Sequence, residues 1–145
     1  MTRNEFAKLF SCAGGYDIDL VASFISDLDS INGILPSEAS EVGLMYNIRL
    51  NGNGFALLSF CIIDNHPVLL FSPAGLRRFL EDNGVFPFEA TDFIDLCMCY
   101  ADKTCDQTEK LEAVEDCYLD IQSILNNQNQ LIQSVRRFVS ELAAK

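Results

Sequence analysis

The single histidine of this chain, His66, is the first residue to test for catalysis, because imidazole is the usual base at neutral pH. It precedes Pro67 in a segment with turn character, Asp64-Asn65-His66-Pro67. A Ser-His-Asp or Cys-His arrangement would have to use His66, yet the chain has no Gly-x-Ser-x-Gly nucleophile elbow. We therefore interpret His66 as a turn residue.

Carboxylates are plentiful, and a pair of them can act as acid and base in glycoside hydrolysis. No spacing singles out two of Asp64, Asp82, Asp92 and Asp95, which fall near predicted turns or in a predicted strand. The segment 52–57 is not a dinucleotide-binding fingerprint, because leucine stands where the third glycine is needed, and no Walker loop occurs. We expect no catalytic residues, no cofactor and no enzymatic activity.

Six cysteines are present: Cys12, Cys61, Cys97, Cys99, Cys105 and Cys117. An even number permits disulfides, but a long, apolar chain without a secretion signal favours free, buried thiols. The cluster formed by Cys97, Cys99 and Cys105 matches no standard zinc spacing, and only one histidine is available to complete it. We therefore expect no metal site.

The formal net charge is −11, with 21 acidic and 10 basic residues. Such a surface repels nucleic acids and anionic membranes, and the doublets Arg77-Arg78 and Arg136-Arg137 do not change this balance. The charge fits a basic or apolar partner, and it equally fits an acidic protein whose charge serves solubility. No apolar run approaches the roughly 18 residues of a membrane span, and residues 1–5 lack a signal-peptide core. We expect a cytoplasmic protein.

The elements that would position any site begin with a predicted three-stranded meander. Leu44, Tyr46, Ile48 and Leu50 recur at every second position, which is typical of a strand with one buried face. The turn-forming residues 51–54 follow, and the apolar runs 55–63 and 68–71 predict two further strands.

Helical patterns flank this meander. Apolar spacing predicts helices over residues 3–13, 17–29 and 74–82, the last of which begins after Ser72-Pro73. Residues 93–100 alternate and predict a strand, with 86–90 as an edge-strand partner restricted by Pro87.

A long helix is predicted over residues 106–143, with apolar residues spaced by three and four. Its seam is Leu111, Val114, Tyr118, Ile121, Leu125, Gln128, Ile132, Val135, Val139 and Leu142. The five amides at 126–130 leave open a break between two helices. We expect the first half of the seam to pack on the domain and the second half to contact a partner or a sister subunit. The whole pattern predicts one α+β domain over residues 1–145, an antiparallel sheet flanked by N-terminal, middle and C-terminal helices.

This order of elements resembles the small acidic chaperones of bacterial type III secretion, the class that serves one or a few effectors. The resemblance rests on the N-terminal helix with Phe6, Leu9 and Phe10, the three meander strands, the helix 74–82 and the last helix. It departs from the family in the extra helix at 17–29 and in the length of the final seam.

The resemblance implies a cytoplasmic homodimer, associated with virulence, that keeps the N-terminal region of an effector protein extended and secretion-competent without catalysis. An extended partner can add to a sheet edge and place apolar side chains in shallow grooves. Phe6, Leu9, Phe10 and Met45 would then bind the effector, and Leu76, Phe79 and Leu80 would form the dimer contact. The alternative is an acidic immunity or inhibitor protein that blocks a folded basic toxin.

Overall fold

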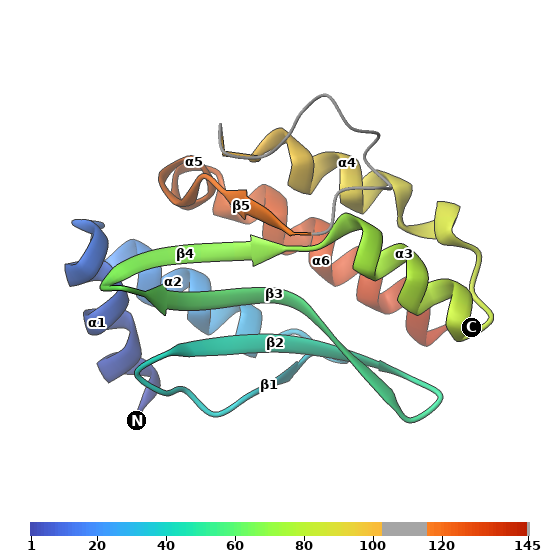
Figure 1. The fold of residues 1–145 in the computed structure, drawn as a ribbon, viewed down its shortest axis with the longest axis horizontal. Helices are drawn as coiled ribbons and strands as arrows, with labels where there is room; N and C mark the ends of the chain where they lie inside the picture. The colour runs from blue at the N-terminus through green and yellow to red at the C-terminus, as the bar shows by residue number, and fades with distance from the viewer. Residues whose placement is uncertain (103–115, 145) are drawn as a thin grey trace.

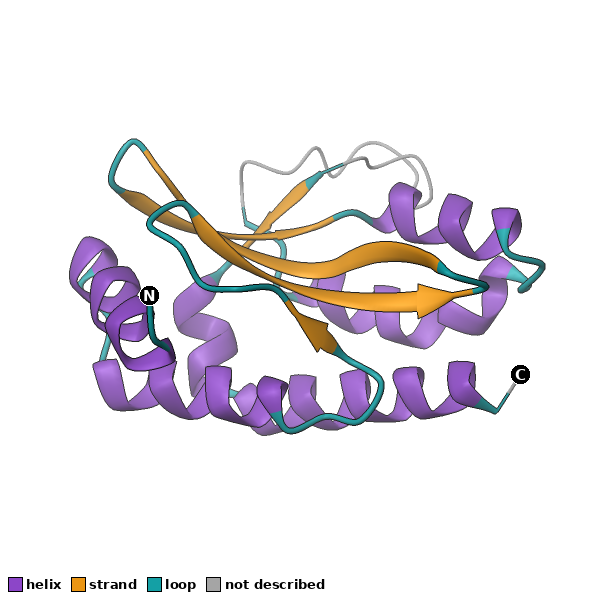
Figure 2. Ribbon diagram, turned by 90° about the horizontal axis from the view of Figure 1, so that it is seen from below, coloured by secondary structure: helices purple, strands orange, loops and turns teal. Residues whose placement is uncertain are grey.

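The computed structural model describes residues 1–102 and 116–144. A five-stranded antiparallel sheet in the order β1-β2-β3-β4-β5 forms one layer, and a long row of helices runs along it (Figures 1 and 2). The predicted α+β class is confirmed. The elements are α1 (Arg3–Gly14), α2 (Ile18–Asp29), β1 (Leu35–Pro36), β2 (Gly43–Leu50), β3 (Asn53–Ile63), β4 (His66–Phe71), α3 (Pro73–Asp82), the 3-10 helix η1 (Pro87–Ala90), α4 (Thr91–Cys99), β5 (Cys117–Leu119), α5 (Ile121–Asn126) and α6 (Gln128–Ala143).

The predicted meander is confirmed, with tighter turns than expected. Asn51 and Gly52 both have positive φ, as in a two-residue hairpin turn. The turn therefore needs only these two residues, and β3 starts at Asn53. The β3–β4 turn is Asp64-Asn65, also at positive φ, and His66 is the first residue of β4. A register shift after Tyr46 makes a bulge in the β2–β3 pair.

The two N-terminal helices form close to their predicted ranges, and each begins at a side-chain cap. Thr2 and Glu5 make a reciprocal capping box at α1, and the Asp17 carboxylate accepts from two backbone N–H groups at the start of α2. Their apolar faces meet the sheet at Phe60 of β3. The rings of Phe6, Phe10, Phe24 and Tyr46 all lie within 6.4 Å of the Phe60 ring centroid.

Helix α3 follows the sequence prediction. The Ser72 hydroxyl accepts from the backbone N–H of Gly75 at 3.0 Å, and Pro73 occupies the first turn. The ring of Phe79 stacks on Phe55 of β3 at 5.3 Å, so the helix is attached to the helical side of the sheet.

The predicted strand pair at 86–90 and 93–100 is wrong, because these residues form η1 and α4. Pro87 fits the first turn of a helix as well as a sheet edge. On α4 the side chains of Phe93 and Cys97 are one turn apart, and both are buried. Phe93 packs against Phe71 of β4 and stacks on Phe138 of α6.

The predicted continuous helix over 106–143 is also wrong within the described residues. Cys117–Leu119 is strand β5, paired with β4, and Tyr118 therefore lies in the sheet. The sequence left open a helix break within the five amides at 126–130, and this break is present at Asn127, between α5 and α6. Leu111 and Val114 lie outside the described residues.

The later part of the seam packs within the domain. Leu131, Ile132, Val135, Phe138, Val139 and Leu142 of α6 are all buried in the single chain, and α6 contacts α2 and α4. The expectation that this half contacts a sister subunit is therefore wrong: the same spacing that suits a coiled coil also suits a helix lying on a core.

Candidate functional site

The face of the sheet turned away from the buried core is the most distinctive surface of the described chain. In β2 the side chains of Leu44, Tyr46 and Ile48 are buried, while those between them point to the other face. The strand register carries this outward face across four strands, from Met45 to Ser59, Leu70 and Tyr118. We call this surface the open face. Its members are Leu35, Met45, Asn47, Arg49, Ala56, Ser59, Cys61, Ile63, His66, Val68, Leu70 and Tyr118.

The open face is unusually apolar. Leu35, Met45, Ile63 and Tyr118 are 46%, 45%, 46% and 42% exposed, and Val68 and Leu70 are partly exposed between them. Arg49 is its only Lys, Arg, Asp or Glu. The solvent face of an antiparallel sheet ordinarily alternates to polar residues, and a contiguous apolar patch marks an interaction site. Among the described residues, this face therefore exposes more apolar surface than the solvent side of an antiparallel sheet ordinarily does.

A groove of about 780 Å³ lies beside α1, at the end of the sheet. Leu9 on α1 lines it, opposite Val42 and Ile62 from the strand ends. Its rim carries the acids Glu5, Glu41 and Asp64, with Lys8 as the one basic side chain among its lining residues. The groove can hold an apolar side chain, and its acidic rim favours a basic residue next to that side chain.

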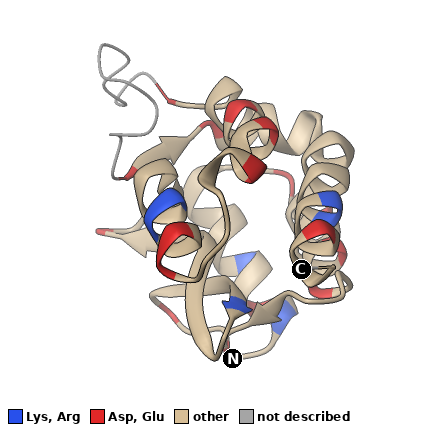
Figure 3. Ribbon diagram, turned by 90° about the vertical axis from the view of Figure 1, so that its right-hand side faces the viewer, with Lys and Arg blue, Asp and Glu red and all other residues tan. Residues whose placement is uncertain are grey.

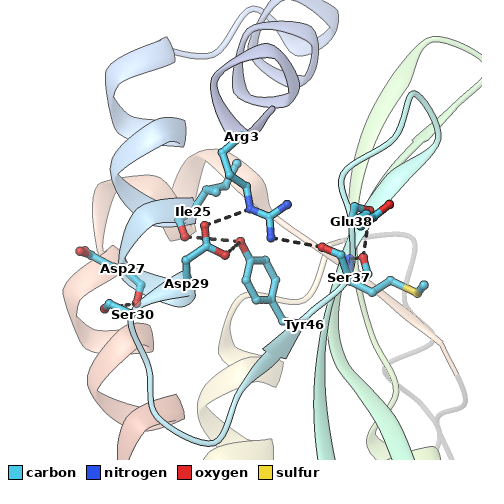
Figure 4. Close-up of polar contacts among 9 residues, drawn as sticks. Arg3, Ile25, Asp27, Asp29, Ser30, Ser37, Glu38 and Tyr46 are labelled. Carbon is cyan, nitrogen blue, oxygen red and sulfur yellow. Dashed lines mark hydrogen bonds and ion pairs between the residues drawn. The ribbon is translucent and has the colours of Figure 1, made fainter. Parts of the chain in front are cut away.

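One polar cluster joins α1, α2 and β2 beneath the sheet. Figure 4 shows the Asp29 carboxylate between Arg3, whose Nε donates to Oδ2 at 3.1 Å, and Tyr46, whose hydroxyl donates to Oδ1 at 3.1 Å. Arg3 Nη2 also donates to the Ser37 carbonyl oxygen at 3.2 Å. Burial first, and then the Asp29 charge, raises the pKa of Tyr46 well above its ordinary value, so the phenol stays a neutral donor. The three side chains bind one another, and this arrangement is structural.

The residues that could have carried catalysis do not converge. His66 is exposed at the start of β4, and the carboxylates of Asp82, Asp92 and Asp95 are exposed on α3 and α4. No group of three or more potential metal ligands occurs in residues 1–102 and 116–144. The remaining candidate, Asp64, lies at the rim of the groove with Glu5 and Glu41.

The cysteines depart in part from the expectation of free thiols. Cys12, Cys61, Cys97 and Cys99 are free, but of these four only Cys97 is buried, and Cys117 is disulfide-bonded. The expectation was therefore wrong for Cys117, because spacing along the chain contains no information on pairing in space. Burial raises the pKa of the Cys61 thiol on the open face, so at neutral pH this side chain behaves as a small apolar group.

The predicted site residues divide between the core and the surface. Phe6 and Phe10 are fully buried, and so are Leu76 and Leu80, while Phe79 is 9% exposed. As placed, these five side chains form the core of one chain and are not surface contacts. Leu9 and Met45 are exposed, one in the groove and the other on the open face.

Several surface residues were not predicted as site residues. Ile63, Val68 and Tyr118 complete the open face, and the Phe86 and Phe88 rings protrude elsewhere. A signal for the open face exists in the sequence: residues 55–63 are apolar at nearly every position instead of every second one. Such a run indicates that both faces of a strand are covered, although residues 1–102 and 116–144 bury only one of them.

Within the described residues, no helix has the length and apolar character needed to cross a membrane. Comparison of the chain with protein-family models, with curated proteins and with solved structures finds no match.

Proposed function

We propose that this chain is a non-catalytic binding protein that holds a segment of another protein, as a type III secretion chaperone holds the N-terminal region of its effector. The observation that carries the proposal is the open face, where four large apolar side chains are each more than two-fifths exposed. A soluble chain that keeps so much apolar surface in contact with water has a partner for it.

The energetic gain from covering this face is substantial. Full burial of one large apolar side chain contributes about 1.5–3 kcal/mol, and the exposed portions of Leu35, Met45, Ile63 and Tyr118 together approach two full side chains. A partner that covers them gains about 3–6 kcal/mol before its entropic costs. This gain suits reversible binding, as required of a chaperone that must release its client.

The groove supports an extended partner over a globular one. The groove, which is lined by Leu9, Val42 and Ile62 at the end of the sheet, admits one or two side chains of an extended segment. Three rim acids favour a segment with Lys or Arg. A homodimer remains part of the proposal, but its contact would have to use residues other than Leu76, Phe79 and Leu80.

The decisive experiment uses the protein encoded by the neighbouring open reading frame, purified in full and as its N-terminal region. Met45→Asp and Ile63→Asp place charges on the open face, and Glu141→Gln on α6 is the exposed control. We expect calorimetry to show reversible binding of the N-terminal region that both open-face variants weaken at least tenfold. Light scattering of the free chain tests the dimer.

Hydrogen exchange of the bound client then distinguishes the two binding classes. Fast exchange through most of the bound segment, apart from the contact residues, agrees with an extended client. Binding only to the full, folded protein, with strong salt dependence, would favour the immunity or inhibitor class instead. Unchanged affinity in both open-face variants would contradict the proposed surface.

A further inference from the structure

Two phenylalanines protrude from the turn that joins α3 to α4. Phe86 is 71% exposed and Phe88 is 65% exposed, and no other aromatic ring of the described chain is as exposed as these two. Their ring centroids lie 5.8 Å apart, so they present one continuous apolar surface. This pair, with Pro87 between its members, is called the Phe finger below. It lies on a different element from the open face.

The backbone holds the Phe finger in place. Pro87 fixes one φ angle in the first turn of η1, and the Glu89 N–H donates to the Phe86 carbonyl oxygen at 3.0 Å. On its N-terminal side, the Val85 N–H donates to the Leu80 carbonyl oxygen at 2.9 Å, which closes the end of α3. On its C-terminal side, Ala90 is fully buried. A surface ordered in advance loses little entropy on binding, so its exposed rings are suited to anchoring a complex.

The charges along the chain around the Phe finger are acidic. Glu81 and Asp82 precede it and Asp92 and Asp95 follow it, all four exposed, and residues 79–100 contain no Lys or Arg. The nearest basic residues along the chain are the Arg77-Arg78 doublet on α3. Figure 3 shows acidic segments spread over several elements, with few basic ones among them. A partner that receives the rings must therefore approach a negative field.

We propose that the Phe finger is a second docking site, which inserts into an apolar pocket ringed by Lys and Arg on a folded partner protein. Charge complementarity selects this occupant. An anionic membrane is repelled by the flanking acids and by the net charge of −11. A second copy carries the same charge, and its own groove is rimmed by Glu5, Glu41 and Asp64. The proposal assigns the Phe finger a partner of its own, separate from the segment that the open face holds.

The test begins with a photo-crosslinking residue, p-benzoylphenylalanine, in place of Phe86 in cells that express the chain from its own gene. The same residue in place of Glu141 on α6 is the control. The expected result is a covalent adduct at position 86, absent at position 141, with a protein of basic isoelectric point. Adducts only with lipid or with a second copy, or no adduct beyond the control, would overturn the proposal.

The crosslinked protein is then purified and its affinity measured against variants. Phe86→Ser and Phe88→Ser should each weaken binding about 30-fold or more, as expected of aromatic anchors. Raised salt should slow association, and Asp82→Lys should do the same. Tyr118→Ser, on the open face, should leave this affinity unchanged. Equal loss in Tyr118→Ser and the two finger variants, or no loss in either finger variant, would show that the Phe finger is not a separate site.

The two proposals fail independently. If the open-face variants lose the effector segment while the finger variants bind every protein normally, only the Phe finger is refuted. If the finger variants lose a basic protein while Met45→Asp and Ile63→Asp have no effect on any partner, only the proposed function is refuted.

Discussion

Replacing Phe138 with alanine tests whether the C-terminal helix belongs to the core or to a subunit interface. The Phe138 side chain is 3% exposed in the single chain, and its ring lies parallel to that of Phe93 with centroids 5.0 Å apart. Truncation of a buried phenylalanine leaves a cavity and typically costs about 3–5 kcal/mol. An aromatic pair adds about 0.5–1.5 kcal/mol beyond its buried area. We expect Phe138→Ala to lose about 4 kcal/mol, a large fraction of a domain stability of about 5–15 kcal/mol.

Urea denaturation followed by circular dichroism measures this loss directly, and Arg137→Ala provides the matched control. Arg137 is the exposed neighbour of Phe138 on the same helix, so its replacement should change stability by no more than about 0.5 kcal/mol. In a thermal melt the same 4 kcal/mol corresponds to a fall of about 10–15 °C. The double variant with Phe93→Ala should show a coupling energy of about 0.5–1.5 kcal/mol.

The reasoning would be refuted by a loss below about 1 kcal/mol, since a buried ring in a packed core cannot be removed so cheaply. It would equally be refuted if the melting temperature of Phe138→Ala rose to the wild-type value at high protein concentration. That outcome would mean that Phe138 is covered by another subunit, because only association makes stability depend on concentration in this way.

Three further predictions concern the sheet and the caps. The pKa of the Tyr46 phenol is higher in the folded chain than in the unfolded chain, so as the pH rises the unfolded chain loses the phenol proton at a lower pH than the folded chain does. The free energy of unfolding should therefore fall above pH 10, by up to about 1.4 kcal/mol per pH unit. Tyr46→Phe should lower stability at pH 7, where the hydrogen bond to Asp29 is lost, and should show a smaller decline between pH 10 and 11 in urea melts. In Gly43→Ala the new Cβ would lie 2.6 Å from a backbone carbonyl oxygen of β3. This overpacking should destabilise the fold by more than about 1 kcal/mol. Gly54→Ala is the control and should cost little stability, because the nearest atom to its new Cβ would be 3.9 Å away. Ser72→Ala removes the cap of α3 and should cost about 1 kcal/mol in the same assay, with unchanged stability arguing against the capping bond.

Apart from the two-residue strand β1, which was not predicted, the sequence predicted the first 82 residues well because local and tertiary preferences agree there. Ser72 caps the helix that was predicted to begin after it, and Asn51-Gly52 adopts the positive φ angles of a hairpin turn. Each of these signals acts within a few residues, so no knowledge of distant contacts is needed to interpret it.

The errors occur where two periods fit the same residues. Ile94, Leu96, Met98 and Tyr100 alternate as in a strand, but the segment buries Phe93 and Cys97 as a helix does, and spacing along the chain does not decide between the two. Strand β5 has three residues and exists through its pairing with β4. A strand so short has no periodic pattern of its own to detect.

The candidate site was predicted less well than the fold because amphipathic spacing does not say which apolar residues remain exposed. Phe6 and Phe10 satisfy a helical stripe and therefore belong to the core, while Leu9 between them lies at the groove. Met45 was correctly placed on the outward side of its strand. Its neighbours on the open face come from four other strands, and only the register brings them together.

The one-sided sheet also has a consequence for handling the isolated protein. Each molecule carries a net charge of −11 and exposes one apolar surface, the open face. At low ionic strength, electrostatic repulsion between the molecules keeps their open faces apart. At about 1 M salt the screening length falls to roughly 3 Å, and this long-range barrier disappears. Purification steps that raise the salt, such as hydrophobic-interaction loading, will therefore drive the free chain into reversible clusters that dilution into low-salt buffer disperses.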